Sequence, residues 1–211
     1  MNTSMQLGID FGTTRTVVAI ADRGNYPVVD FVDHHGDAAS AIPSMVAARD
    51  GELRFGFDAV AVAGDPTFTV LRSFKRLFSN PTAGPEQRIR IGDTTVTLGA
   101  VLTGFFEHVR DAIVKRSSSA RTRTLHAAVA VPANALGNQR LTTLDAFRRA
   151  GFDAFAILNE PSAHIKVMNS CSSRQASKKS RQAATQRAKA PRRQDLFKFS
   201  SLVLPYSLGL R

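Results

Sequence analysis

Hydrophobic and polar residues alternate near the N-terminus in a pattern that predicts a β-hairpin. Leu7 and Ile9 fall on the same face of an extended segment, as a period of two requires. This first strand ends near Asp10, and a turn containing Gly12 leads into a second strand over residues 15–21. Because glycine has no side chain, the backbone can turn there and come close to a ligand.

Other apolar segments that are bounded by turn residues predict further strands. They cover residues 26–32, 42–48, 53–55, 88–91, 94–98, 125–131 and 154–158. Pro43 suits an edge strand, because proline lacks the N–H that a neighbouring strand would need. Turns are predicted at residues 50–51 and 92–93, and a loop is predicted over residues 33–40.

Apolar residues that recur at three- and four-residue spacing predict helices between these strands. The clearest stripe comprises Leu98, Val101, Leu102, Phe105, Phe106, Val109 and Ile113, and predicts a helix from residue 98 to about 115. The same spacing predicts helices over residues 57–63 and 67–78. Leu141, Leu144 and Phe147 mark a last helix that ends before Gly151.

The order of these elements is a series of antiparallel strands followed by helix, strand, helix and strand. It predicts an α/β fold in which helices pack on a mixed sheet. Ligands of such sheets bind beyond the ends of strands. The strand ends at Asp10 and Leu158 are therefore expected to converge on one cleft.

The positive charge of the chain is concentrated in its last quarter. The formal net charge is +11 over 211 residues. Residues 1–164 carry 17 Lys and Arg against 16 Asp and Glu, whereas residues 165–211 carry 11 against one. The basicity therefore says nothing about the N-terminal body. The segment from 164 onward is predicted to be disordered, because it is polar and highly charged.

Composition argues against several classes of protein. The apolar runs are short compared with the roughly 18 residues of a membrane helix, and the N-terminus lacks the pattern of a signal peptide. Cys171 is the single cysteine, and the five histidines show no metal-ligand spacing. We therefore expect a cytoplasmic protein without a disulfide framework or a membrane partner.

The turn of the N-terminal hairpin carries groups that suit a phosphate and its metal ion. Asp10 supplies a hard oxygen ligand of the kind that Mg²⁺ prefers. Gly12, Thr13 and Thr14 offer backbone N–H groups and hydroxyls that can surround phosphate oxygens. These residues alone are equally compatible with an ordinary hairpin turn.

Four segments together resemble the seventy-kilodalton heat-shock chaperone (DnaK) family. They are Leu7-Gly8-Ile9-Asp10-Phe11-Gly12-Thr13-Thr14, Phe74-Lys75-Arg76-Leu77, Val129-Ala130-Val131-Pro132-Ala133 with Gln139-Arg140, and Leu158-Asn159-Glu160-Pro161-Ser162-Ala163. The resemblance covers about residues 5–163. It implies that residues 1–163 form the first lobe of that family's ATPase domain, with an actin-like (ribonuclease-H-like) fold.

The resemblance also implies a role for each matching residue. Asp10 would hold a water of the Mg²⁺ shell, and Gly12, Thr13 and Thr14 would bind the β- and γ-phosphates of ATP or ADP. Lys75 would position the attacking water and offset charge on the γ-phosphate, and Glu160 would act near the metal and the attacking water. Pro132 and Arg140 would relay the nucleotide state to a substrate-binding domain. Unfolded client polypeptides and cochaperones would be the partners.

The resemblance stops after Ala163, and residues 164–211 form a basic tail that does not match the family. We interpret the tail as the product of a frameshift or truncation. The chain by itself is then expected to bind Mg-ATP weakly or undetectably in calorimetry.

Two other functions are compatible with parts of the sequence. One is a small-molecule kinase of the actin-like superfamily, which shares the opening motif. The other is weak, non-specific binding of nucleic acid through the basic tail.

Overall fold

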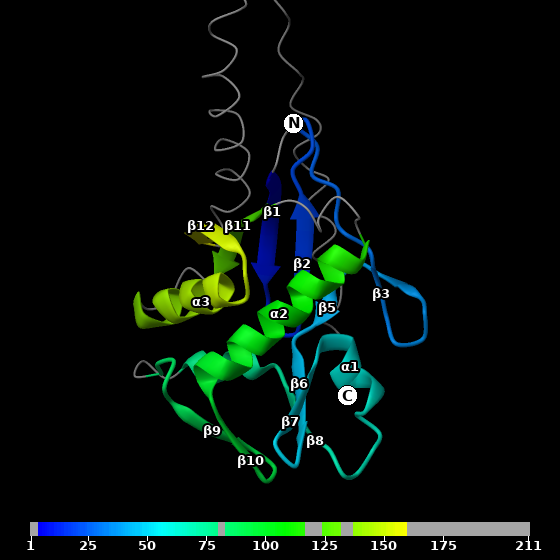
Figure 1. Cartoon of the computed structure of the whole chain (residues 1–211), viewed down its shortest axis with the longest axis vertical. Coiled ribbons are helices and arrows are strands. Elements are labelled where there is room, and N and C mark those ends of the chain that lie inside the picture. The colour runs from blue at the N-terminus through cyan, green and yellow to red at the C-terminus, as the bar shows by residue number, and fades with distance from the viewer. Residues whose placement is uncertain (1–3, 80–82, 117–123, 132–136, 160–211) are drawn as a thin grey trace, which may run out of the picture. The chain divides into compact units, whose positions relative to one another are not determined.

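A mixed five-stranded sheet organises the computed structural model, which describes residues 4–79, 83–116, 124–131 and 137–159 (Figure 1). Its strand order is β12-β11-β1-β2-β5. The strands are β1 (Ser4–Phe11), β2 (Arg15–Ile20), β5 (Ile42–Pro43), β11 (Thr124–Val131) and β12 (Asp153–Asn159). β1, β11 and β12 are parallel, whereas β2 and β5 run antiparallel to their neighbours. The predicted mixed sheet is thereby confirmed.

Smaller sheets adjoin this central sheet. One has the order β7-β6-β8, and two are hairpins, β3-β4 and β9-β10. Their bounds are β3 (Phe31–Val32), β4 (Ala38–Ala39), β6 (Met45–Arg49), β7 (Glu52–Phe55), β8 (Thr69–Arg72), β9 (Arg88–Ile91) and β10 (Thr94–Thr97). The turn predicted at residues 50–51 is confirmed, with Asp50 and Gly51 at φ 49° and 82°.

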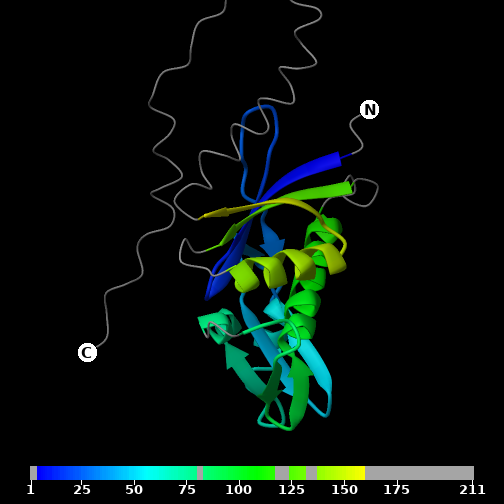
Figure 2. The same cartoon turned by 90° about the vertical axis from the view of Figure 1, so that its left-hand side faces the viewer.

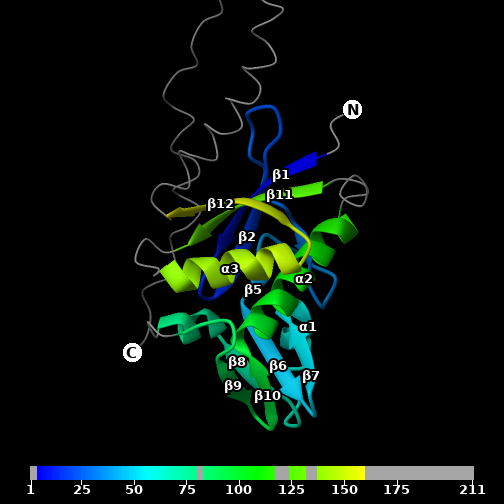
Figure 3. The same cartoon turned by 60° about the vertical axis from the view of Figure 1, so that its left-hand side comes forward.

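Two long helices lie on one face of the five-stranded sheet, as Figures 2 and 3 show. They are α2 (Leu98–Arg116) and α3 (Gly137–Arg149). A short helix, α1 (Gly56–Ala61), follows β7, and the 3₁₀ helix η1 (Phe74–Ser79) follows β8. Among the described residues, no helix is both long and apolar enough to span a membrane.

Phenylalanine rings join the helices to the end of β1. Phe11 contacts Phe106 edge-on at 5.0 Å between ring centroids, and Phe106 stacks on Phe147 of α3 at 3.7 Å. Phe74 contacts both Phe11 and Phe105. All five rings are buried. Because Phe11 directly precedes the hairpin turn, the packing of this cluster holds the first residues of the turn in place.

The helix predicted over residues 67–78 is wrong. Residues 69–72 form β8 and pair with the free edge of β6, and η1 then starts at Phe74. Ser73 lies between them with φ 56°, a left-handed conformation that ends the strand sharply. Helical spacing in the sequence was misleading here, because strand pairing with a distant segment outweighed the local preference.

The strand predicted over residues 42–48 is interrupted at Ser44. Residues before it pair with β2, and residues after it form the central strand of a different sheet. The prediction of an edge strand therefore holds for β5 and is wrong for β6. The strand predicted over residues 26–32 contracts to β3, and the loop predicted over residues 33–40 contains β4.

Two of the three apolar residues predicted to mark α3, Leu144 and Phe147, pack in the core, and the third does not. Leu141 is 68% exposed, whereas Thr142 and Thr143 are buried. Both threonine hydroxyls donate to backbone carbonyls four residues earlier, at 2.8 Å, which satisfies them inside the protein. Polar residues can therefore share the buried face of α3 with Phe147.

His108 of α2 is expected to make folding stability depend on pH. Its side chain is mostly buried, with Nδ1 3.7 Å from an Asp58 carboxylate oxygen, and its Nε2 has no hydrogen-bond partner within the described chain. Burial lowers the His108 pKa and Lys115 lowers it further, while Asp58 and Asp111 raise it. Because the unfolded chain then binds a proton at higher pH than the folded chain, stability should fall as pH drops below about 6.5.

Urea unfolding between pH 7.5 and 5.5 would measure this effect. The stability of His108→Gln should decline less over this range than that of the unsubstituted chain. His34→Gln changes an exposed histidine and serves as the control. Equal pH dependence of His108→Gln and the unsubstituted chain would contradict the assignment.

Candidate functional site

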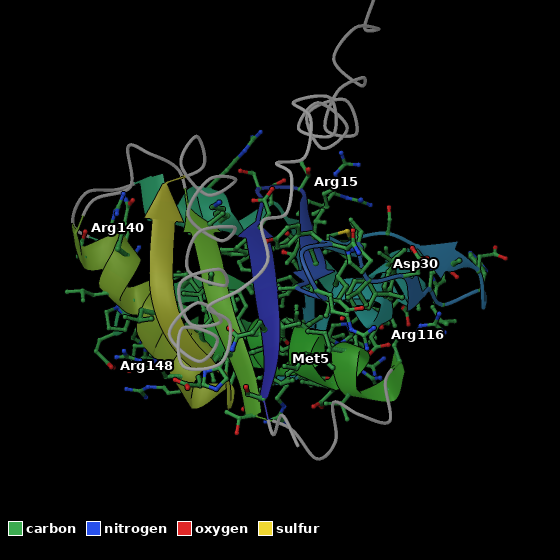
Figure 4. The ribbon with its side chains drawn as sticks, turned by 90° about the horizontal axis from the view of Figure 1, so that it is seen from above. Met5, Arg15, Asp30, Arg116, Arg140 and Arg148 are labelled. Carbon is green, nitrogen blue, oxygen red and sulfur yellow. The ribbon has the colours of Figure 1, made fainter. Side chains whose placement is uncertain are left out.

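The turn between β1 and β2 lies where the parallel strands of the sheet end. Asp10 is in register with Ala130 of β11, and Ala130 is in register with Leu158 of β12. The strand ends at Asp10 and Leu158 therefore lie at the same end of the sheet, whereas the cleft expected there stays a prediction. Figure 4 shows Arg15 and Arg140 toward this edge of the sheet, and Met5 and Arg148 toward the opposite edge.

The carbonyl groups around this turn are held by donors from elsewhere in the chain. The Ser44 hydroxyl donates to the Gly12 carbonyl at 3.0 Å, and the Ser44 N–H donates to the Thr14 carbonyl at 2.9 Å. The ammonium group of Lys75 donates to the Phe11 carbonyl. Three backbone oxygens that would repel a bound anion are thus already occupied.

The backbone N–H groups of the turn differ from its carbonyls, because most of them are not bonded to other described parts of the chain. Gly12 donates to the Arg15 and Asp10 carbonyls, both at 3.1 Å, which closes the turn. Thr13 and Thr14 donate their N–H groups to no acceptor in the described part of the chain. Two adjacent N–H donors in an exposed turn form a concave site for an anion such as a phosphate oxygen.

Lys75 brings a positive charge to the base of the turn. Its Nζ also lies 5.0 Å from the centroid of the Phe11 ring, a cation–π arrangement. Lys75 comes from η1 and is half-buried. The ammonium group of Lys75 is therefore directed at the turn.

Ser44 supports the turn of the site, and sequence analysis missed it together with Thr16, a neighbour that contacts Ser44 from β2. Their hydroxyl oxygens lie 3.3 Å apart, and both residues are fully buried. The contacts of Ser44 reach across 28 and 32 residues to the turn region. The one local signal was a serine directly after Pro43 in a predicted strand, which does not indicate where its hydroxyl points.

Asp10 is an exposed carboxylate at the strand end beside the turn. Among the described residues, no group of three or more His, Cys, Asp or Glu could hold a metal ion. Mg²⁺ often binds through one or two carboxylates plus the phosphates of a nucleotide and keeps several waters. The donor set fits Mg²⁺ carried in with a phosphate, and does not fit a cage made by these residues alone.

The remaining residues of the predicted site are Glu160, Pro132 and Arg140. Glu160 and Pro132 lie outside the described residues, as does the predicted tail from 164 to 211. Arg140 is half-buried in α3. The structure thus brings Asp10, the turn and Lys75 together, while the predicted roles of Glu160, Pro132 and Arg140 stay predictions.

The sequence of this chain is similar to the sequences of known chaperones. The family described as Hsp70 protein matches residues 6–165. The chaperone protein HscA of Cronobacter sakazakii is 31% identical over 170 residues, covering 74% of this chain and 27% of that protein. DnaK of Halobacterium salinarum is 30% identical over 158 residues, covering 74% and 23%. DnaK of Mycoplasmopsis pulmonis is 29% identical over 157 residues, covering 74% and 24%. The chain spans about a quarter of the length of these curated relatives.

Proposed function

The chain belongs to the Hsp70 family, and from this premise we propose that it supplies the phosphate-binding lobe of an ATP-dependent, DnaK-type chaperone. The observation that carries the proposal is the turn at residues 12–14. Its neighbouring carbonyls are bonded to Ser44 and Lys75, while the Thr13 and Thr14 N–H groups have no acceptor among the residues that the structure describes. The small-molecule kinase alternative is not favoured, because the HscA and DnaK relatives are chaperones.

In this proposal the turn binds the β- and γ-phosphates of ATP or ADP. The two N–H groups and the threonine hydroxyls donate to phosphate oxygens, and the absence of a Gly12 side chain lets the backbone come close. Lys75 offsets negative charge on the γ-phosphate and orients the attacking water. Positioning and charge compensation of this kind supply most of the catalysis of phosphoryl transfer.

Asp10 would hold Mg²⁺ beside the bound phosphates, a role that suits a single carboxylate. When bound, Mg²⁺ neutralises charge that develops on the phosphate oxygens. Glu160 acts near the metal and the attacking water. Pro132 and Arg140 pass the nucleotide state to a substrate-binding domain, which would place client polypeptides and cochaperones among the partners. The predicted location is the cytoplasm.

A titration of the ¹⁵N-labelled chain with Mg-ATP, followed by NMR, tests the proposal. This measurement detects millimolar binding, so it also covers the weak affinity expected for this chain by itself. The amide resonances of Thr13 and Thr14 should shift with saturation, and those of β9 and β10 should not. Absence of any shift at the turn up to about 10 mM, a concentration that reveals even a very weak site, would refute a phosphate site there.

Lys75→Ala should lower the affinity for Mg-ATP about tenfold in the same titration, because it removes a charge-assisted contact. Arg76→Ala is the matched control. Arg76 is the next residue on η1, is exposed, and also carries a positive charge. If both variants weaken binding equally, the effect is one of net charge and the assignment of Lys75 fails.

A further inference from the structure

We propose that Ser44 is a positioning residue that holds the phosphate-binding turn in register with Lys75. The proposal rests on the proposed function in that the turn binds phosphate. Ser44 touches no ligand atom in this scheme. Its role follows from its place between β5 and β6, where the chain leaves the five-stranded sheet and enters the sheet formed by β6, β7 and β8.

Ser44 contacts the turn through two of its own atoms. The hydroxyl donates to the Gly12 carbonyl, and the backbone N–H donates to the Thr14 carbonyl. These two carbonyls stand on either side of Thr13, whose N–H is a proposed phosphate donor. A shift of Ser44 would therefore move both ends of the phosphate-binding segment at once.

The third contact of Ser44 reaches the segment that carries Lys75. Its carbonyl accepts the N–H of Ser73 at 3.1 Å, and the Ser73 carbonyl accepts the N–H of Arg76 at 2.9 Å. Ser73 is the residue with φ 56°, the corner between β8 and η1. Ser44 thus supports the left-handed corner that directs Lys75 toward the turn.

The hydroxyl bonds of Ser44 can be assigned a direction. Ser44 has one hydroxyl proton, and it is used in the bond to the Gly12 carbonyl. The Thr16 hydroxyl, 3.3 Å away, must then be the donor to the Ser44 oxygen. Because both side chains are fully buried, the arrangement leaves little freedom for the Ser44 rotamer.

A double-mutant cycle between Ser44 and Lys75 tests the proposal, with Mg-ATP affinity measured by the NMR titration. Ser44→Ala should weaken binding about five- to tenfold. Lys75→Ala should cost about tenfold in the unsubstituted chain and less than about twofold in the Ser44→Ala chain, since the lysine would no longer be in register. Equal factors in both backgrounds would overturn the proposal.

The variant Thr16→Val tests whether an effect of Ser44→Ala on binding comes from the position of the turn or only from the stability of the fold. It removes the hydroxyl bond between Thr16 and Ser44 but keeps the bond from Ser44 to Gly12. Thr16→Val should therefore bind Mg-ATP within about twofold of the unsubstituted chain. The double variant Ser44→Ala/Thr16→Val leaves no unpaired threonine hydroxyl, yet should bind as weakly as Ser44→Ala. Recovery of affinity in the double variant would mean that Ser44 has only a structural role.

Hydrogen exchange of the chain without nucleotide tests the role of Ser44 by a measurement that does not depend on Mg-ATP binding. In Ser44→Ala the amide protons of Gly12 and Ser73 should exchange at least about threefold faster, whereas Thr16→Val should leave Ser73 unchanged. If the unsubstituted chain shows no Mg-ATP shift, the proposed function fails while this measurement still decides whether Ser44 links the two segments. Changes confined to residues 43–45 would disprove the link.

Discussion

Replacing Gly12 with alanine is expected to weaken Mg-ATP binding at the turn strongly. A Cβ atom at this position would lie 2.4 Å from the Arg15 carbonyl oxygen, which is backbone and cannot move as a side chain can. That oxygen is also the acceptor for the Gly12 N–H. The turn must therefore open, and the Thr13 and Thr14 donors lose their arrangement. We expect affinity to fall at least about tenfold in the NMR titration.

Gly64→Ala is the matched control for this substitution. A Cβ atom at Gly64 would meet no atom within 4 Å, and its φ lies outside the left-handed region. Gly64→Ala should therefore bind Mg-ATP as the unsubstituted chain does. If Gly12→Ala also binds normally, a ligand does not use the turn in the form that the structure shows.

Phe106→Ala should cause a severe loss of folding stability. Phe106 is fully buried and contacts Phe11 of β1, Phe105 of its own helix and Phe147 of α3. Truncation of a buried phenylalanine costs about 3–5 kcal/mol, through lost burial and the cavity that stays. Folded domains have a total stability of about 5–15 kcal/mol, so a large share of the unfolding free energy would be lost.

Urea unfolding followed by circular dichroism would measure this change. Leu141→Ala is the control, because Leu141 is also apolar and helical but 68% exposed, and it should change stability by less than about 0.5 kcal/mol. Phe106→Leu should fall between the two. A loss below about 1 kcal/mol for Phe106→Ala would contradict the view that this ring joins β1 to both helices.

Much of the fold could be predicted because local patterns agreed with the tertiary arrangement. The hairpin around Gly12 follows from alternation and a turn residue, and α2 follows from a stripe with three- and four-residue spacing. Both elements keep their predicted face in the core. β11 was recognised as a strand because its apolar run suits burial on both faces.

Prediction failed where distant pairing outweighed the local pattern. Residues 69–72 became a strand because β6 offered an unpaired edge. The strand over residues 42–48 was divided because Ser44 bonds to the turn on one side and to Ser73 on the other. On α3, hydroxyl bonds to the helix backbone allowed threonines into the core in place of Leu141. The partners of β8 and of Ser44 lie far away in the sequence, whereas the threonine hydroxyls bond to carbonyls only four residues away.

The family, the mixed α/β fold and the residues of the turn could be inferred from the amino-acid order, because each of these is encoded in short segments with defined order and spacing. Which groups of the turn can contact a ligand depends on how distant segments fold against it. Ser44 and Lys75 occupy its carbonyls from 32 and 64 residues away along the chain. The direction of a hydrogen bond between such distant residues is set by packing, and packing is decided by the whole fold rather than by either segment.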